Sequence, residues 1–248
     1  MKRWMRCWAT VVALAVPAGA TAQVQLTVRV LSQDAKLIGT GVGGARVTVR
    51  NAASRAVLAT GEHQGGTGDT RRILDRTPRG VGIYHTDGAA VFTVAVPIDT
   101  PTVVEVEAEG PLGYPQARQR ATATVLLVPG QDIVGDGLVL TLHGLIVELL
   151  DAGAVDDRGL PVRARIRMLC GCPFTAAGLW DAGRVTVVAR VYDGPRVVAE
   201  TALTFTGEEN IWAGRLSSGP AAAGTRLVVL AADAERVNLG RSDERVLP

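Results

Sequence analysis

Residues 162–168 read Val-Arg-Ala-Arg-Ile-Arg-Met, so apolar and charged side chains alternate at every position. An alternation with a period of two is typical of a β-strand that is buried on one face and exposed to water on the other. The four apolar side chains of this stretch share one face, and the three arginines share the other. The stretch therefore predicts a strand that packs its even-numbered residues into a core.

The same alternation recurs from Val24 to about Ala231, bounded by glycine, proline and Asx turns. The run 138–150 is apolar enough for a buried helix, but His143-Gly144 interrupts it, so we interpret it as two short strands. No convincing amphipathic helix is present, which favours an all-β fold of antiparallel sheets packed as β-sandwiches. The other predicted strands are 25–30, 45–50, 90–96, 102–109, 121–128, 184–192, 197–205 and 226–230.

The first 22 residues predict a secretory signal peptide. Pro17 and Gly19 end its apolar segment short of the ~18 residues that a membrane span needs. We therefore expect cleavage, export to the periplasm or the extracellular space, and no membrane span in the mature chain. The basic start, the apolar middle and the cleavage site are Lys2, Arg3 and Arg6, residues 9–16, and Ala20-Thr21-Ala22.

Cleavage removes 22 of the 248 residues and leaves room for two small β-domains. The leader holds three of the 26 basic residues, so 23 remain against 24 acidic ones. No basic run is left to follow a phosphate backbone, so we expect no nucleic-acid partner. The turn-rich segment 129–137 is the predicted connection between a domain at 23–137 and an Ig-like β-sandwich domain at 138–248.

Two segments of the first domain carry a family resemblance. Gly44-Ala45-Arg46-Val47-Thr48-Val49, followed by Ala59-Thr60-Gly61, is answered by the later run Thr86-Asp87-Gly88-Ala89-Ala90-Val91-Phe92-Thr93-Val94. This pattern resembles transthyretin-like and bacterial Ig-like surface modules, over roughly a third of the chain. One residue usual between Asp87 and Gly88 is missing. The resemblance implies a β-sandwich and an exported setting, and no active site carries over from it.

Charged segments of the first domain have two interpretations each. The Gly- and Arg-rich stretch 61–82 predicts a long loop, disordered in preference to binding, with local positive charge from Arg71, Arg72, Arg76 and Arg79. Glu105, Glu107 and Glu109 share one strand face. They suggest either cross-hairpin pairing with Arg118 and Arg120 or a divalent cation site. Carboxylates in a row along one strand favour the pairing.

The mature chain holds two cysteines, Cys170 and Cys172. If the strand from Val162 continued to them, Met168, Cys170 and Cys172 would share its core face. Extended residues two apart lie ~6.6 Å from each other, near the upper limit for a disulfide, and Gly171 permits a bend. Such a disulfide would contribute only ~1.6 kcal/mol through loop entropy.

Three interpretations of the pair stay open. One is a plain disulfide or buried pair, and another is thiol exchange in an oxidising compartment. The third is a Cu(I) site built from the three sulfur ligands Met168, Cys170 and Cys172. Zinc fits less well, because His63, His85 and His143 lie far away in sequence without a recognisable spacing.

The sequence holds no hydrolase elbow, phosphate loop or His-Glu-x-x-His motif, so we expect no catalytic activity other than thiol exchange. Trp180 and Trp212 are expected to be core or rim anchors. The resulting hypothesis is an exported, non-catalytic binding or scaffolding protein of the bacterial envelope, without a cofactor, whose partner is a protein or a cell-surface component. The alternative is a periplasmic accessory protein that handles copper or exchanges thiols through Cys170 and Cys172.

Overall fold

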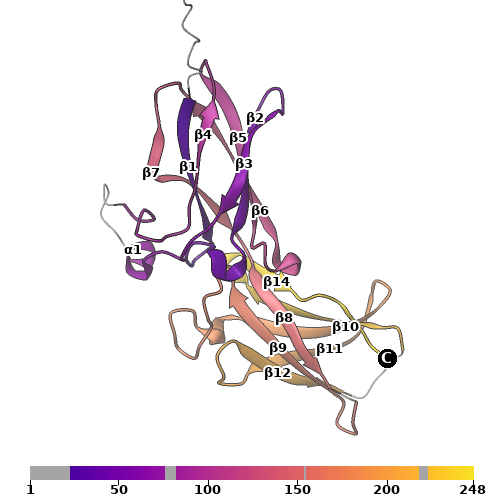
Figure 1. The fold of residues 1–248 in the computed structure, drawn as a ribbon. Helices are drawn as coiled ribbons and strands as arrows, with labels where there is room; N and C mark the ends of the chain where they lie inside the picture. Colours follow the sequence, from indigo (N-terminus) through magenta and orange to yellow (C-terminus); the bar gives the residue numbers. More distant parts are fainter. Residues whose placement is uncertain (1–22, 76–81, 154, 218–222) are drawn as a thin grey trace, which may run out of the picture.

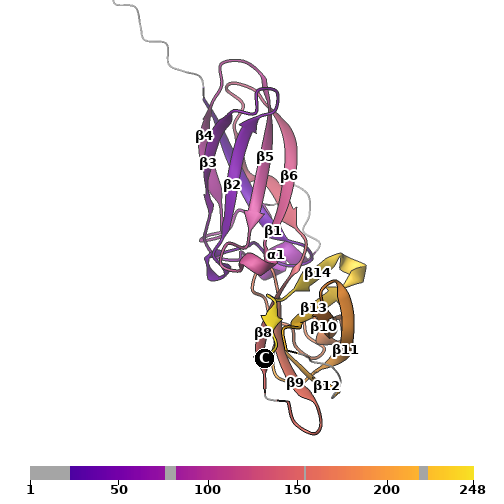
Figure 2. The same ribbon diagram turned by 90° about the vertical axis from the view of Figure 1, so that its right-hand side faces the viewer.

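The computed structural model describes residues 23–75, 82–153, 155–217 and 223–248. Figures 1 and 2 show two β-rich units stacked end to end, the first built from β1–β7 and the second from β8–β15. The predicted all-β fold class is confirmed. In the described ranges, no helix has the length and apolar character to cross a membrane. The predicted signal peptide and the residues Arg76 and Arg79 lie outside the described residues.

The first unit is a sandwich of two sheets, with strand orders β4-β1-β7 and β3-β2-β5-β6. The alternate apolar side chains of β1, β2 and β5 fill the space between the sheets. β1 pairs antiparallel with β4 but parallel with β7, so this sandwich is not purely antiparallel. The strands are β1 (Gln23–Ser32), β2 (Ala45–Asn51), β3 (Val57–His63), β4 (Phe92–Pro97), β5 (Thr102–Gly110), β6 (Gln119–Leu127) and β7 (Ile133–Leu142).

The second unit is one sheet of eight strands, in the order β14-β13-β10-β11-β12-β9-β8 with β15 paired to β13. This sheet curls until β14 and β13 lie beside β8, so it is nearly closed instead of being divided into two layers. A Cβ added to Gly240 would lie 2.5 Å from the Leu145 carbonyl oxygen, so the near-closure depends on a glycine. Its strands are β8 (Leu145–Ala152), β9 (Leu160–Met168), β10 (Thr186–Asp193), β11 (Arg196–Phe205), β12 (Ile211–Leu216), β13 (Arg226–Asp233), β14 (Asn238–Arg241) and β15 (Arg245–Val246).

The run 138–150 forms two strands that His143-Gly144 separates, as predicted. The structure corrects the placement of the first of them. β7 adds to β1 of the first sandwich, so residues 138–142 pack with the first unit and not with the second. The chain crosses between the units at His143-Gly144, which connects the end of β7 to the start of β8.

The stretch 61–75 is not a plain loop, which corrects the sequence prediction for this part of 61–82. β3 extends to His63, residues 64 and 66 form bridges with 91 and 89, and Asp69 caps the short helix α1 (Thr70–Leu74). Ile73 of this segment packs against a small cluster of Leu37, Ala89 and Ala90, which Leu31 of β1 also contacts. Backbone bridges hold the stretch 61–75 in place. Such bridges do not require alternating apolar residues, so the sequence shows no hydrophobic periodicity here.

His63 lies fully buried beneath this segment. Its Nε2 accepts a hydrogen bond from the Val30 N–H at 3.2 Å, and its Nδ1 donates to the Ile38 carbonyl at 3.1 Å. Burial lowers the pKa of His63 to about 4, against the opposing effect of the Ile38 hydrogen bond. The folded protein therefore holds this imidazole neutral at every pH above about 4.

This burial predicts a loss of stability in mild acid. In the unfolded chain an imidazole binds a proton below pH ~6.5, whereas the folded protein resists protonation, so stability is full above pH ~6.5 and falls as the pH drops towards 4. The expected loss is about 3 kcal/mol. Urea unfolding across this range, compared between wild type and His63→Gln, isolates the contribution.

The exposed His143 provides the matched control. His143→Gln should keep the loss of stability between pH 6.5 and 4, whereas His63→Gln should lack the part of this loss that comes from the buried His63. Because His63→Gln removes buried hydrogen bonds, an NMR titration of the wild-type ring is the second measurement. Protonation of His63 in the folded protein near pH 6.5 would contradict the assignment.

Candidate functional site

β9 ends at Met168, and the chain then turns sharply through the two cysteines. The Gly171 N–H donates to the Met168 carbonyl at 2.8 Å, and the Met168 N–H donates to the Cys172 carbonyl at 3.1 Å. Gly171 has a φ of +81°, a conformation that favours glycine. The expectation that the strand continues to Cys172 is therefore wrong, because this turn reverses the chain after Met168.

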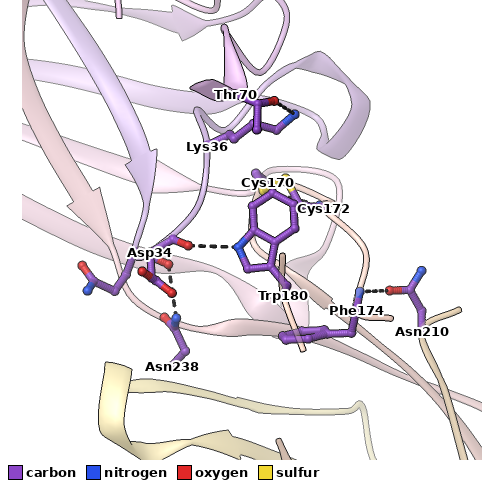
Figure 3. Close-up of a disulfide and its surroundings, with 10 residues drawn as sticks. Asp34, Lys36, Thr70, Cys170, Cys172, Phe174, Trp180, Asn210 and Asn238 are labelled. Atoms are coloured by element: carbon purple, nitrogen blue, oxygen red, sulfur yellow. Dashed lines mark hydrogen bonds between the residues drawn. A yellow bond between two sulfur atoms is a disulfide. The ribbon is translucent and has the colours of Figure 1, made fainter. Parts of the chain in front are cut away.

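The turn brings the two cysteines closer together than an extended strand would. Their Cα atoms lie 5.4 Å apart, and their sulfurs are at disulfide distance, as Figure 3 shows. Each residue is 5% exposed, and both belong to the core of the second unit together with Met168. The three sulfur side chains predicted to share one face thus do lie in one buried cluster. A disulfide consumes the thiolates that a Cu(I) site would need.

Leu169, between Met168 and the first cysteine, points the other way. It is fully buried in the core of the first unit, although β9 and the cysteines belong to the second. The reverse holds for Ala35, which belongs to the loop after β1 of the first unit but is buried in the core of the second unit. A Cβ added to Gly171 would lie 2.9 Å from Val42 Cγ1 of the first unit. The turn 168–172 is therefore shared by both units.

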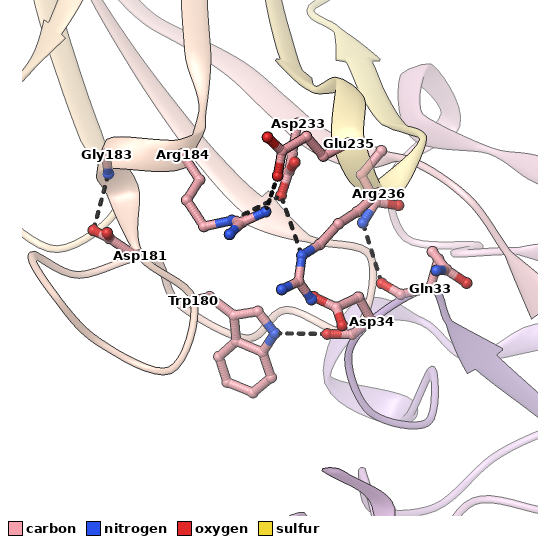
Figure 4. A network of polar contacts seen from close by, with 10 residues as sticks. Gln33, Asp34, Trp180, Asp181, Gly183, Arg184, Asp233, Glu235 and Arg236 are labelled. Atoms are coloured by element: carbon pink, nitrogen blue, oxygen red, sulfur yellow. Dashed lines mark hydrogen bonds and ion pairs between the residues drawn. The ribbon is translucent and has the colours of Figure 1, made fainter.

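Polar contacts close the same junction, as Figure 4 shows. The Trp180 indole N–H donates to the Asp34 carbonyl at 3.0 Å, and the Asp34 carboxylate pairs with the Arg236 guanidinium. Asn238 is fully buried; its side chain accepts a hydrogen bond from the Gly144 N–H at 3.0 Å and donates to the Gln33 carbonyl at 3.2 Å. Trp180, expected as a core or rim anchor, is half-buried at the junction.

Arg167 makes a third set of contacts between the units. One of its guanidinium nitrogens donates to the Tyr114 hydroxyl at 2.7 Å and to a Glu148 carboxylate oxygen at 2.8 Å. Its guanidinium carbon lies 5.0 Å from the centroid of the Tyr114 ring. Arg167 faces away from the second core, as the alternation in 162–168 predicts, and uses that face to hold the first unit.

Trp212 packs inside the second unit. It is 1% exposed and makes edge contacts with Phe174 and Phe205 at centroid distances of 6.0 Å and 5.1 Å. The Asn210 side chain accepts a hydrogen bond from the Phe174 N–H at 2.8 Å, which fixes the segment that follows the cysteines. The prediction of a packing role for Trp212 is confirmed.

The acidic row on β5 forms ion pairs with neighbouring arginines. Glu109 lies 3.7 Å from Arg118 and 3.2 Å from Arg120, which confirms the predicted pairing across the hairpin. Glu105 pairs at 2.9 Å with Arg55, which was not predicted as a partner of the acidic row. In the part of the chain that the structure describes, no three His, Cys, Asp or Glu residues are grouped to hold a metal ion.

Asp136 has a role that the sequence did not indicate. Its carboxylate accepts hydrogen bonds from the N–H groups of Ile83, Tyr84 and His85 at 2.7 to 2.8 Å. Burial works to raise the pKa of Asp136, but these three hydrogen bonds outweigh it and hold the pKa below its usual range. Asp136, a residue of β7, thus fixes residues 83–85, of which Tyr84 packs against the cluster of Leu37, Ala89 and Ala90.

Comparison with known proteins gives no match, either to a family model or to a curated sequence. The resemblance to transthyretin-like and Ig-like modules therefore stays a prediction.

The shared turn predicts that Leu169 stabilises the junction strongly. Leu169→Ala removes a fully buried side chain from the first core, which should cost about 2–5 kcal/mol in the free energy of unfolding. Leu179→Ala is the matched control, because Leu179 follows the same turn but is 65% exposed, and it should change stability by no more than about 0.5 kcal/mol. Urea unfolding of both variants measures the difference, and equal losses would contradict this role.

Proposed function

We propose that this chain is an exported, non-catalytic binding or scaffolding protein of the bacterial envelope, whose partner is a protein or a cell-surface component. The observation that carries the proposal is the interlocked junction. Leu169 of the turn after β9 is buried in the first core, and Ala35 of the loop after β1 is buried in the second. A connection that buries side chains in both directions holds two β-units at a fixed angle. Fixed presentation of two surfaces suits a scaffold or a binding protein.

The position of the cysteines supports a structural role for them. Thiol exchange requires a thiolate to reach a disulfide sulfur, and both residues are almost entirely covered. They close a turn that places Leu169 in one core and their own side chains in the other. The predicted signal peptide adds the exported setting, in which a disulfide persists.

The alternative function is a periplasmic accessory protein that binds copper or exchanges thiols. The observation in its favour is that Met168, Cys170 and Cys172 lie in one buried cluster, as three soft ligands would have to. In that case the two cysteines would be reduced when copper is bound. The two proposals differ in the redox state and the reactivity of the same two sulfurs.

The scaffold proposal predicts that the mature protein, recovered from an oxidising compartment, is two hydrogens lighter than its reduced mass and carries no copper. It also predicts that reduced glutathione forms no mixed disulfide with the folded protein, because the sulfurs are inaccessible. Intact mass after alkylation, together with elemental analysis, tests both statements. A Leu179→Cys variant is the positive control for alkylation, since a thiol at that exposed position should be alkylated completely.

Copper at one per chain, or a glutathione adduct on the folded protein, would favour the alternative. Cys170→Ser/Cys172→Ser separates the proposals further. As a scaffold, the double variant should stay folded and lose only about 1.6 kcal/mol of loop-entropy stabilisation. A metal or redox protein would lose its activity entirely.

A further inference from the structure

A cleft of about 610 Å³ lies where the first unit meets the outer face of the eight-stranded sheet of the second unit. One wall is the segment 116–119, which includes the end of the short 3₁₀ helix η2 (Pro115–Ala117). The floor is formed by β10, β13 and β14, and η2 lies against β14 and β8. Its volume falls in the range of about 300–1,000 Å³ that small-molecule sites occupy.

The floor of the cleft is apolar. On β10 the alternate residues Val187, Ala189 and Val191 fill the core, so Val188 between them faces outwards. Leu230 of β13 and Leu239 of β14 also line the cleft, and Leu239 is 53% exposed. An apolar group placed here would remove these side chains from water, which is favourable.

The charges that line the cleft are all positive. Its lining residues include three arginines, Arg118, Arg190 and Arg241, and no aspartate or glutamate. Arg190 pairs with Glu200 at 2.5 Å, but Arg118 lies 3.7 Å from Glu109 and Arg241 lies 3.9 Å from Glu244. Arg118 also donates to the Leu112 carbonyl at 3.3 Å. Each guanidinium has five N–H donors, so both arginines keep donors for a carboxylate.

We propose that the cleft binds a small amphipathic anion, namely a single carboxylate on an apolar chain. Arg118 and Arg241 hold the carboxylate, and the chain lies along Val188, Leu230 and Leu239. The inference deepens the proposed binding function and rests on it. The negative charge of the ligand complements the arginines of the cleft, whereas a cationic or a neutral polar ligand would gain nothing from this lining.

Decanoate is the probe, titrated by calorimetry into the mature protein at low salt. We expect decanoate to bind, and we expect decyltrimethylammonium, with the same chain and the opposite charge, and acetate, with the charge and no chain, to bind at least about tenfold more weakly. Arg241→Gln should weaken decanoate binding about tenfold, and Leu239→Ser should weaken it several-fold.

Arg196→Gln removes a charge from an exposed site on β11, outside the cleft, and should leave decanoate binding unchanged. Unfolding midpoints establish that each variant is folded. If Arg241→Gln does not fold, Leu239→Ser still tests whether the cleft binds decanoate. Absence of decanoate binding, equal binding of the cationic analogue, or wild-type affinity in both cleft variants would overturn the proposal. These outcomes concern only the ligand class, whereas copper loading or reactive thiols would overturn the binding function itself.

Discussion

The structure depends on one constraint, that a single short turn supplies side chains to two cores. Met168, Cys170 and Cys172 pack into the second unit, while Leu169 between them packs into the first. The start of β8 repeats this division, because Leu145 faces the second core and Ile146 the first. Neither unit can rotate against the other without exposing buried apolar surface, which makes the junction part of the fold and not a flexible linker.

The proposed binding site follows from the same constraint. Its wall belongs to the first unit and its floor to the second, so its shape exists only while the junction holds. A binding site between two mobile units has a lower affinity, because binding must also order the two units. Here Leu169, the Asp34–Arg236 pair and the buried Asn238 order them in advance. The disulfide between Cys170 and Cys172 spans the same turn.

Much of the fold could be predicted from the sequence, because alternation such as that in 162–168 reports directly on a half-buried strand. β14 and β15 were not predicted because they are short, and β3 and β12 were not predicted because Gly61 and Gly214 interrupt their apolar alternation. β7 was assigned to the wrong unit because local pattern does not reveal which sheet a strand joins. The sequence placed Met168, Cys170 and Cys172 together, but by extending a strand that in fact turns at Gly171. It could not indicate Leu169, whose burial depends on a core supplied by residues far away in the chain.

The buried contacts at the junction make the two units one rigid body. Double electron–electron resonance between spin labels at Val134→Cys in β7 and Val197→Cys in β11 tests this rigidity. Both positions are exposed, at 62% and 42%, and the paired native cysteines of the mature chain would not react with the label. A rigid junction gives a single narrow distance distribution between the labels, and a broad or two-peaked distribution would contradict it.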